Sequence, residues 1–354
     1  MRTFFNILLI TLLSICTLNA QTTNGKIDSL LNNFYNKGMF NGSALVSMNG
    51  KIVYKSAFGL ANFEYEIPNK PDTKFEIGSC TKQFTATLIM MLKEKGQISL
   101  DDKITDYLPE YPAEKGDRIT IHHLLSHTSG IPEYIELPEM EYLLFRENKP
   151  TKFMKVFWDL DLNFEPGSEL RYSNSNYFIL GAIIEEITGK PYAQVLQENI
   201  FKRLGMTNSG IIQITEILKN KAYGYIKLDD TISVAPCWNT SGAFSAGNIY
   251  STVEDLFKWQ LALQSNTLIN KESFEIMLTQ NFSRYGYGFA ILNRTHKDGS
   301  KYTLYGHEGE IPGFRSLINI IKEDNSSVIL LDNNQNPNHF KIANDIRKIV
   351  YEDN

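Results

Sequence analysis

Strand patterns occur near both ends of the chain, and a long section without them lies between. Residues 42–61 contain two β-rich runs around Asn49–Gly50, a strong hairpin signal because both residues tolerate a positive φ. Close to the C-terminus, further strand patterns follow one another with short connections, which implies an antiparallel meander. We therefore expect one antiparallel sheet built from both ends of the chain. The C-terminal patterns occupy residues 285–294, 301–310, 314–323 and 326–334, with turns at Asp298–Gly299 and Asp324–Asn325.

Helical patterns flank these strands and fill the middle of the chain. Apolar residues recur at helical spacing in residues 26–37, and a last helix is expected over about 338–351. Residues 79–228 are dominated by helical patterns, including Tyr177–Ile187 and Tyr192–Leu204. The predicted fold class is therefore α/β of the α+β type: an antiparallel sheet flanked by helices from both chain ends, with an inserted, mostly helical region.

The size of the chain suits one large or two medium domains. It has 354 residues, 42% hydrophobic and 21% charged, which is an ordinary globular composition. We predict a sheet-and-helix domain from residues 21–78 plus 239–354 and a mostly helical domain over 79–238, with a cleft at their junction. The net charge of −5, with no block of Lys and Arg, argues against nucleic acid as a partner.

The N-terminus has the pattern of a secretory signal peptide. Arg2 is followed by an apolar run from Phe4 to about Leu18 that is too short to span a bilayer. We expect residues 1–20 to be removed after Ala20 and the protein to be exported, to a periplasm or beyond. Leu18 is larger than the small residue that signal peptidase prefers, so the cut site is less defined than the export. The bulky Ile15 before Cys16 argues against a lipid anchor.

Two cysteines remain after residue 20. Cys80 and Cys237 can form at most one bridge between them, so the chain is not a disulfide scaffold and depends on its core. A cysteine inside a helical pattern is more often a small packed hydrophobe. Whether the two are bridged stays open at this point.

A serine and a lysine three residues apart begin a helical pattern at residues 75–96, "FEIGSCTKQFTATLIMMLKEKG". Phe84, Leu88, Met91 and Leu92 form one apolar stripe, and a glycine at residue 96 supplies a stop. Ser79 and Lys82 share a face of this helix. Serine is also a common helix cap and lysine a common surface residue, so the pair alone is weak evidence of a site.

The pair nevertheless has the parts of a nucleophilic site. A serine hydroxyl attacks a carbonyl only when a neighbouring base takes its proton. Lys82 can do so only when neutral, which requires its pKa to fall from about 10.4 toward roughly 7–8. The partial positive charge of a helix N-terminus disfavours a protonated lysine in the first turn and favours an oxyanion nearby.

A second segment, "RYSNSNYFILGAIIEE", contains Tyr172 and Asn174. The tyrosine can pass a proton to a leaving group, and the asparagine can hydrogen-bond both the lysine and a substrate amide. The alternative is an ordinary helix entry, in which Ser173 or Asn174 caps the helix and Tyr172 packs at the junction.

A third segment, "YGHEGEIPGF", places His307, Glu308 and Gly309 on a predicted strand. The glycine permits a close backbone approach to a substrate, and the N–H of Glu310 can join that of Ser79 in binding an oxyanion. The alternative for His307 is a hydrogen-bonded histidine of an edge strand. The segment lacks the second histidine of a zinc motif, so we expect no metal.

Taken together and in this order, Ser79-x-x-Lys82, Tyr172-x-Asn174 and His307-x-Gly309 resemble the motifs of the serine β-lactamase and penicillin-binding-protein superfamily. The similarity is strongest to the class C β-lactamase-related branch, which includes D-alanyl-D-alanine carboxypeptidases, D-aminopeptidases and esterases. It extends over most of the chain after residue 20, through "DDKITDYLPEYP", "ITIHHLLSHTSGIPEY", "FEPGSELRYSNSNYFILG", "IFKRLGMTNS", "SGAFSAGNIYSTVEDLFKW" and "GHEGEIPGF".

The resemblance implies a role for each motif. Ser79 would be the acylated nucleophile, Lys82 its base partner, Tyr172 a general base and acid, and Asn174 a positioning group. The N–H groups of Ser79 and Glu310 would form the oxyanion hole, and no cofactor is implied. His127 of the "HTSG" segment is interpreted as loop structure. The substrate would be a small peptide or an ester, with cell-wall fragments among the candidates.

The third motif departs from the family pattern. Many β-lactamases carry Lys-Thr/Ser-Gly there, and the lysine attracts the substrate carboxylate. His307 is mostly neutral at pH 7 and Glu308 adds negative charge, so carboxylate binding should suffer unless Arg315 compensates. We therefore expect amide or ester cleavage with weak or no β-lactam hydrolysis. A penicillin-binding sensor that is acylated but barely turns over, or a true β-lactamase, are the alternatives.

Another serine-hydrolase class was considered. An α/β-hydrolase needs Gly-x-Ser-x-Gly between a strand and a helix, and the nearest match, "GAFSAG" at Gly242–Gly247, has one residue too many. Pocket walls are expected from loops at Pro132–Pro150 and Asn208–Trp238. Neither the natural substrate nor the oligomeric state follows from these patterns.

Overall fold

The computed structural model describes residues 23–138, 150–213, 215–228, 231–236, 239–295, 299–335 and 337–352. The expected signal peptide, with Cys16, and Cys237 lie outside these residues. So do Asp298 and part of the loop expected at Pro132–Pro150. No helix in the described ranges is both long enough and apolar enough to pass through a bilayer.

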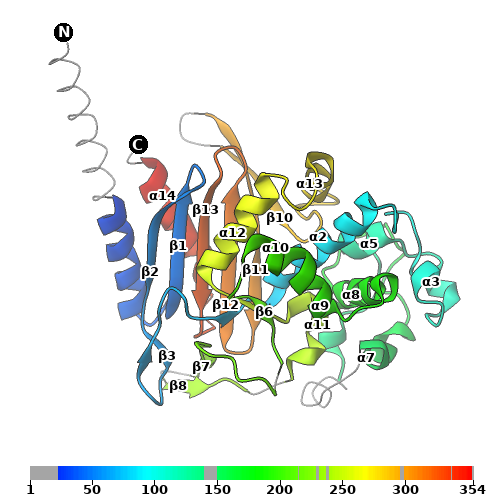
Figure 1. Cartoon of the computed structure of the whole chain (residues 1–354), viewed down its shortest axis with the longest axis horizontal. Coiled ribbons are helices and arrows are strands. Elements are labelled where there is room, and N and C mark those ends of the chain that lie inside the picture. Colours follow the sequence, from blue (N-terminus) through cyan, green and yellow to red (C-terminus); the bar gives the residue numbers. More distant parts are fainter. Residues whose placement is uncertain are drawn as a thin grey trace, which may run out of the picture.

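A six-stranded antiparallel sheet forms the centre of the protein, as predicted (Figure 1). Its order is β10-β11-β12-β13-β1-β2, so strands from the two chain ends meet where β13 pairs with β1. The strands are β1 (Gly42–Met48), β2 (Lys51–Ala57), β10 (Ala290–Thr295), β11 (Lys301–Ile311), β12 (Phe314–Ile321) and β13 (Ser326–Asp332).

Local sequence explains the sheet's turns. Asn49 and Gly50 have φ values of 49° and 69° and close the β1–β2 hairpin, as the sequence predicted. Asn325, with φ of 58°, helps to close the β12–β13 turn. Each of these residue types adopts positive φ at lower cost than a branched side chain would.

The sheet buries both faces, and successive residues of its central strands alternate between two cores. In β1, Leu45 contacts one core while Ala44 and Val46 contact the other. In β13, Ile329 and Val328 divide in the same way. This period of two is the reason that the strands read as almost continuous apolar runs.

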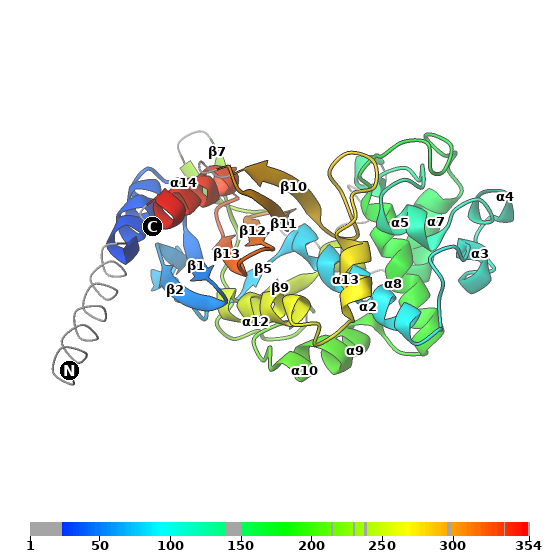
Figure 2. The same ribbon diagram turned by 90° about the horizontal axis from the view of Figure 1, so that it is seen from above.

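Helices from the chain ends cover one face. Residues 23–36 are helical, and α14 (His339–Glu352) lies beside them against the sheet (Figure 2). Ile27 and Leu31 of the first helix and Ile342 and Ile346 of α14 meet in the smaller core. These two predicted helices are therefore confirmed.

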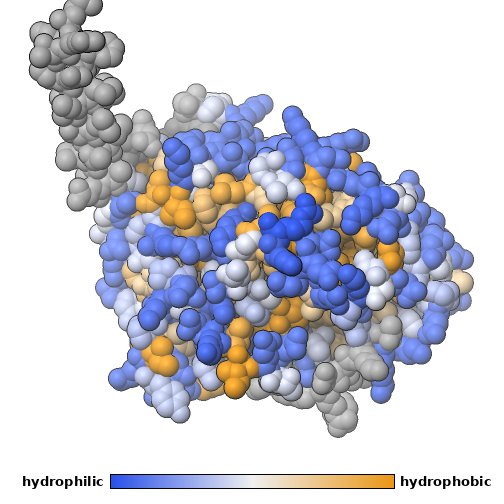
Figure 3. Space-filling view, viewed as in Figure 1, coloured by the Kyte–Doolittle hydropathy of each residue, from blue (hydrophilic) through white to orange (hydrophobic). Residues whose placement is uncertain are grey.

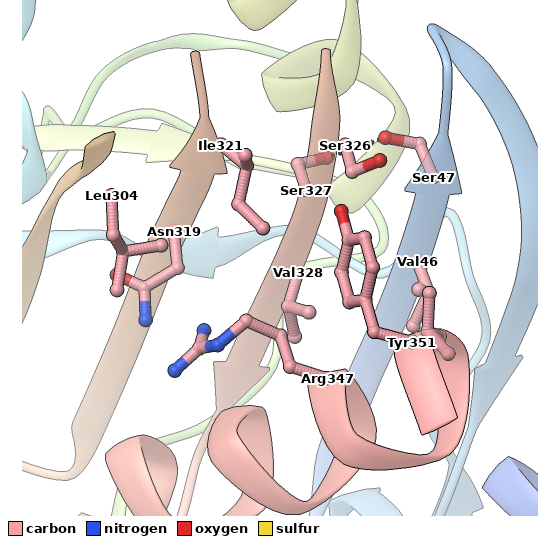
Figure 4. A pocket seen from close by; sticks show the side chains of 11 residues that line it. Val46, Ser47, Leu304, Asn319, Ile321, Ser326, Ser327, Val328, Arg347 and Tyr351 are labelled. Atoms are coloured by element: carbon pink, nitrogen blue, oxygen red, sulfur yellow. Dashed lines mark hydrogen bonds between the residues drawn. The ribbon is translucent and has the colours of Figure 1, made fainter. Parts of the chain in front are cut away.

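A small cavity remains under α14. Arg347 and Tyr351 of that helix point toward β12, β13 and β1, and Ser47 and Ser327 hydrogen-bond across the neighbouring strands at 2.7 Å (Figure 4). The cavity measures about 10 Å³, which is room for about one water molecule. It is too small for an organic substrate.

The opposite face carries the larger core and the helical part of the chain. Helix α12 (Val253–Gln264) packs on β1 and β13. Helices α2 (Thr81–Glu94) and α8 (Asn174–Thr188) lie beyond the edge of the sheet, in the helical part (Figure 2). Phe84 of α2 stacks on Trp259 of α12 with ring centroids 4.0 Å apart. Helix α2 is buried from Thr81 to Leu92, so the predicted apolar stripe describes only part of its buried surface.

Shorter elements complete the helical part. The helix expected over Tyr192–Leu204 is divided by a π-helical segment, η3, into α9 and α10. The remaining elements are η1 (Gly78–Cys80), α3 (Ile104–Tyr107), α4 (Ala113–Gly116), α5 (Ile121–Leu125), η2 (Tyr134–Glu136), α7 (Pro150–Trp158), α9 (Tyr192–Leu196), η3 (Gln197–Phe201), α10 (Lys202–Leu204), η4 (Thr240–Gly242), α11 (Phe244–Gly247) and α13 (Lys271–Met277).

Three small sheets lie outside the main one. Strands β5 (Phe75–Glu76), β9 (Ile249–Ser251) and β6 (Gly210–Ile211) form the one that leads directly into η1. The other two are the hairpins β3 (Leu60–Asn62) with β4 (Ile67–Pro68) and β7 (Tyr225–Leu228) with β8 (Thr231–Val234). On the face shown in Figure 3, hydrophilic side chains are interspersed with small apolar areas. The domain boundaries at residues 78 and 238 stay a prediction.

Candidate active site

Ser79 lies at the entrance of α2. It belongs to the 3-10 turn η1, one step earlier than the expected first turn of the α-helix, and it is half-buried. Gly78 has a φ of 49°, and a Cβ on it would lie 2.8 Å from the backbone nitrogen of Glu310. Glycine is therefore required for the turn to approach β11 so closely.

Lys82 is fully buried one turn after the serine. Its Nζ lies 3.1 Å from Ser79 Oγ, 2.6 Å from Asn174 Oδ1 and 2.8 Å from the carbonyl oxygen of Ala246. Burial lowers the pKa of Lys82 from 10.5 to about 7, and the nearby Glu133 opposes that shift. The amine therefore exchanges its proton near neutral pH.

The three contacts fit a neutral amine. Neutral Lys82 has two N–H donors, which match the oxygens of Asn174 and Ala246, and one lone pair, which can accept the hydroxyl proton of Ser79. When it is protonated, the same three atoms accept its three protons. The geometry thus serves both protonation states without rearrangement.

Tyr172 lies just before α8, and the residue is 36% exposed. A hydrogen bond to Ser79 lowers its pKa, but desolvation is the larger influence and the pKa is raised overall. Lys82 Nζ lies 4.9 Å from the centroid of the tyrosine ring. The structure therefore brings Ser79, Lys82 and Tyr172 together, and the motifs predicted that these residues lie close to one another.

Asn174 is the first residue of α8. Its Oδ1 faces Lys82, while its backbone N–H and its Nδ2 both donate to Glu133 Oε2, at 2.6 and 2.9 Å. Ser173 occupies the cap position, as the helix-cap alternative expected, but its side chain makes no capping bond. The carboxylate of Glu133 accepts the first backbone N–H of the helix, that of Asn174.

Aromatic rings surround Tyr172. His127 is buried, and its ring centroid lies 4.3 Å from that of Tyr172. The ring centroid of Tyr285 lies 4.8 Å from that of His127. His127 accepts the backbone N–H of Ser173 at 3.2 Å through Nδ1. Its interpretation as loop structure is consistent with this, since it supports the segment that carries the tyrosine.

His307 of β11 is buried and neutral. Its Nδ1 contacts the carbonyl oxygen of Glu308 and so carries the proton, which leaves Nε2 to accept from the Tyr285 hydroxyl at 2.9 Å. Burial and the nearby Lys82 lower the pKa of His307 to about 3. This histidine therefore supplies no positive charge at neutral pH.

Strand β11 is fastened to the serine turn. A Cβ on Gly309 would lie 1.9 Å from the carbonyl oxygen of Ile77, so this glycine permits close approach to the chain's own backbone, whereas we had expected approach to a substrate. Ser316 donates to the same carbonyl at 2.8 Å, and the Cys80 thiol donates to the carbonyl of His307 at 3.1 Å.

Cys80 is a buried, free thiol, and burial raises its pKa to about 12. It therefore stays protonated and packs as a small residue between the serine turn and the sheet.

Arg315 is engaged by the chain's own carboxylates. It forms an ion pair with Glu310, and its Nε lies 3.4 Å from Glu308 Oε1. Its side chain is only 14% exposed. Binding of a substrate carboxylate by Arg315, as the sequence suggested, would require it to leave at least one of these partners.

A cavity of about 580 Å³ borders β5 and the turn between β11 and β12, and none of the predicted site residues lines it. It is bordered by Glu76, which precedes Ser79 by three residues, and by Pro312, which follows Glu310 by two. Much of its wall comes from the segment that the sequence analysis expected to line a pocket. The apolar part of that wall is Ile211, Ile212, Ile217, Leu218, Ala222, Val234, Ala235, Pro236, Pro312 and Phe314.

The family model for β-lactamase matches residues 27–351. The chain belongs to the β-lactamase family. This confirms the resemblance inferred from the three motifs and makes the protein a serine hydrolase of that family.

Individual relatives agree with this assignment. PbpX of Bacillus subtilis (strain 168), provisionally named a penicillin-binding protein, is 34% identical over 312 residues, which are 86% of this chain and 74% of that protein. The structure of a penicillin binding protein from Bacillus halodurans is 28% identical, with a TM-score of 0.78, and the match covers 92% of this chain and 98% of that one.

A further solved structure is that of a D-amino acid amidase from Ochrobactrum anthropi SV3, complexed with L-phenylalanine amide. It is 26% identical and has a TM-score of 0.79, and the match covers 94% of this chain and 98% of that one. The fold predicted from the sequence, a sheet from both chain ends with a helical insertion, is therefore confirmed as that of the family.

Sequence reasoning missed three participants. The Ala246 carbonyl lies in the segment that partly matches an α/β-hydrolase motif, and Tyr285 begins a strand pattern, so neither residue carries a signal for this site. Glu133 lies three residues after the "HTSG" segment, and the only available signal was a carboxylate beside a proline in a loop. None of these contacts is local in sequence.

Proposed function

We propose that the protein is an exported serine hydrolase that works through an acyl-enzyme on Ser79. The observation that carries this proposal is the contact of Lys82 with Ser79 Oγ at 3.1 Å, made by a fully buried amine whose pKa is lowered to about 7. A general base is most effective when its pKa lies near the working pH.

The proposed reaction has two halves. Lys82 takes the proton of Ser79 while Oγ attacks the substrate carbonyl carbon, and the N–H groups of Ser79 and Glu310 bind the resulting oxyanion. Tyr172 donates its proton to the leaving amine or alcohol as its bond to carbon breaks, and takes in turn the proton that Lys82 removed from Ser79. A water molecule then attacks the acyl-enzyme with the same groups acting in reverse, which releases the acid and restores the serine.

The substrate class that we propose is an amide of a D-amino acid, a short peptide with D-residues, or a carboxylic ester. The similarity to a D-amino acid amidase supports the amide. Neutral His307 and the paired Arg315 leave little positive charge for a substrate carboxylate, which supports weak or absent β-lactam hydrolysis. That amidase was crystallised with L-phenylalanine amide, which supports a substrate with an apolar side chain.

Active-site labelling tests the nucleophile. Protein lacking residues 1–20 would be treated with a fluorophosphonate and its mass and modified peptide determined. We expect one adduct on Ser79, none in Ser79→Ala, and normal labelling in Ser168→Ala, which alters an exposed serine. Failure of folded wild-type protein to form an adduct would contradict the proposal.

A substrate panel tests the reaction. We expect turnover of D-amino acid amides or p-nitrophenyl esters, faster with D-phenylalanine amide than with D-alanine amide, and slow or no hydrolysis of penicillins. A permanent penicillin adduct without turnover of any substrate would favour the penicillin-binding sensor. Rapid penicillin hydrolysis would favour a true β-lactamase.

Export is tested separately. Expression of the full chain in a bacterial host, followed by cell fractionation and N-terminal sequencing, should find protein outside the cytoplasm beginning near Gln21. Recovery of uncleaved protein in the cytoplasm would contradict this part of the proposal.

A further inference from the structure

Glu133 lies behind the proposed catalytic groups and touches none of the reacting atoms. It comes immediately before η2 and accepts three hydrogen bonds, from the backbone N–H and the Nδ2 of Asn174 and from the backbone N–H of Ile135. An ionised carboxylate has only acceptors, so three N–H donors match that form. Glu133 is therefore held firmly while its own charge is desolvated.

This arrangement decides how the Asn174 amide is oriented. Because a carboxylate cannot donate, the amide must direct its NH₂ group toward Glu133, and its oxygen then faces Lys82 at 2.6 Å. The reverse orientation would point an NH₂ group at the lysine and an oxygen at the carboxylate. Glu133 thus selects the orientation in which Asn174 accepts from Lys82.

The same carboxylate lies at the N-terminus of the 15-residue helix α8. Asn174 begins that helix, and Ser173 makes no capping bond with its side chain. The unpaired N–H groups and the helix dipole favour a negative charge at this place. Glu133 therefore stabilises the helix end that carries Asn174 as well as the orientation of its amide.

Among the charged groups of the described residues, Glu133 has the largest effect on Lys82, and this effect raises the pKa of the lysine. The other titratable groups around the lysine within the described residues are Cys80, His127, Tyr172, Tyr177 and His307. Their thiol, phenol and imidazole groups are neutral at pH 7, because burial raises the pKa of the thiol and phenols and lowers the pKa of both histidines. An opposite charge favours the protonated lysine.

We propose that Glu133 is a positioning residue of this active site, which fixes the Asn174 amide toward Lys82 and sets the pH range in which the lysine can act as a base. This inference rests on the proposed function. It adds a residue outside the three motifs, 41 positions from Asn174, whose role combines geometry and charge.

Glu133→Gln separates the charge from the geometry. Glutamine keeps an oxygen that can accept from Asn174 but removes the negative charge, so Lys82 should lose its proton at lower pH. We expect the acid limb of the fluorophosphonate labelling rate to shift by about one pH unit toward lower pH. The pKa of Lys82, followed by NMR with ¹³C-labelled lysine and assigned with Lys82→Arg, should move in the same direction.

Two further variants complete the series. Glu133→Asp keeps the charge on a shorter side chain, so the rate should fall while the acid limb moves less than in Glu133→Gln. Glu133→Ala frees the Asn174 amide as well and should lower the plateau rate on the order of tenfold. The matched control is Glu136→Gln, because Glu136 ends the short helix η2 that Glu133 precedes, but its side chain is 67% exposed and pairs with Arg171.

The outcomes separate this inference from the proposed function. If folded wild-type protein is not labelled at Ser79, the proposed function fails. If wild-type protein is labelled but folded Glu133→Gln keeps both the wild-type acid limb and the wild-type Lys82 pKa, the charge role is overturned. If Glu133→Ala labels as fast as Glu136→Gln, the positioning role is overturned. Should Glu133→Gln fail to fold, Glu133→Asp with an unchanged rate would also overturn positioning.

Discussion

Helices α2 and α14 lie on opposite sides of the sheet and bury different kinds of side chain (Figure 2). Helix α14 buries one stripe, with His339, Ile342, Ala343, Ile346 and Val350 turned inward and charged residues outside. Helix α2 is buried on almost every side and includes five buried polar residues: Thr81, Lys82, Gln83, Thr85 and Thr87. Burial of apolar surface is enough to explain the stripe of α14. Burial of the polar residues of α2 is costly unless each of them has a hydrogen-bond partner.

The two helices also contain one long basic side chain each that is largely withdrawn from water. Lys82 has three oxygen partners, while Arg347 bonds Asn344 but leaves Nη1 buried without a hydrogen bond. Burial lowers the pKa of both groups. The comparison associates a buried cation that has an oxygen partner for each proton with the proposed reactive centre, and a cation with an unpaired nitrogen with ordinary packing.

The largest difference should appear in reactivity. Lys82→Met removes the proposed base and should slow fluorophosphonate labelling by about 10³- to 10⁴-fold or more, whereas Arg347→Met should leave the rate unchanged. Stopped-flow or gel-based labelling of both variants measures this. Equal loss in the two variants would show that burial of a cation, and not its position, controls activity.

The next largest effect should appear in the pH dependence of stability. The pKa of Lys82 falls from 10.5 in the unfolded chain to about 7 in the fold, so the buried amine destabilises the protein fully below pH 7 and not at all above pH 10.5. Relative to Lys82→Met, wild-type protein should gain on the order of 3–5 kcal/mol between these limits. Urea unfolding of both proteins across this range measures this gain. If the lysine were ordinarily solvated, the difference between their free energies of unfolding would not change with pH.

Core packing on the other side of the sheet should give a smaller effect. Ile346→Ala in α14 removes a fully buried side chain and should cost about 2–5 kcal/mol by creating a cavity. Labelling per folded molecule should be unchanged, because α14 contributes nothing to the site. Thermal unfolding and active-site titration test this, with exposed Lys348→Ala as the control; a lost site with an intact fold would be the contrary result.

Loss of a buried hydroxyl in α2 should have the next largest effect on stability. Thr85 Oγ1 lies 2.6 Å from the carbonyl of Ser245 and 2.6 Å from the hydroxyl of Tyr192. Thr85→Val keeps the shape but leaves both partners unsatisfied, which should cost about 1–3 kcal/mol. Chemical denaturation measures the change. Unaltered stability would mean that water or Tyr192 alone replaces the lost contacts.

The smallest effect should come from Arg347→Met. Replacing a buried, partly unsatisfied cation by an apolar side chain of similar length should change stability by less than about 1 kcal/mol, in either direction. The cavity of about 10 Å³ beside it leaves room for the exchange. A loss of several kcal/mol in denaturant melts would show that the guanidinium is a structural anchor.

Much of the fold follows from local sequence. The strands from both ends were predictable because apolar runs alternate with turn residues such as Asn49, Gly50 and Asn325, whose conformations the structure retains. The two- and three-residue strands β5, β6 and β9 were not predicted, since so few residues carry no periodic signal. Their small sheet nevertheless leads directly, through β5, into the turn η1 that contains Ser79.

The site was predictable in its motifs but not in its support. Residue types and spacing led to Ser79, Lys82, Tyr172 and Asn174, and the structure gathers these side chains. The bonds of Lys82 to Ala246 and of Asn174 to Glu133 span 164 and 41 residues. Such pairs depend on the completed tertiary structure, which no local pattern encodes.

The meeting of both chain ends in one sheet constrains how this protein can be synthesised. The backbone of Asn41 donates to the side chain of Asp332, 291 residues away, and β1 pairs with β13 along its length. The central sheet therefore cannot close until residue 332 has left the ribosome, and pairing over such a span slows folding. A nascent chain whose sheet is still open remains unfolded for longer, as the proposed export through a translocation pore would require.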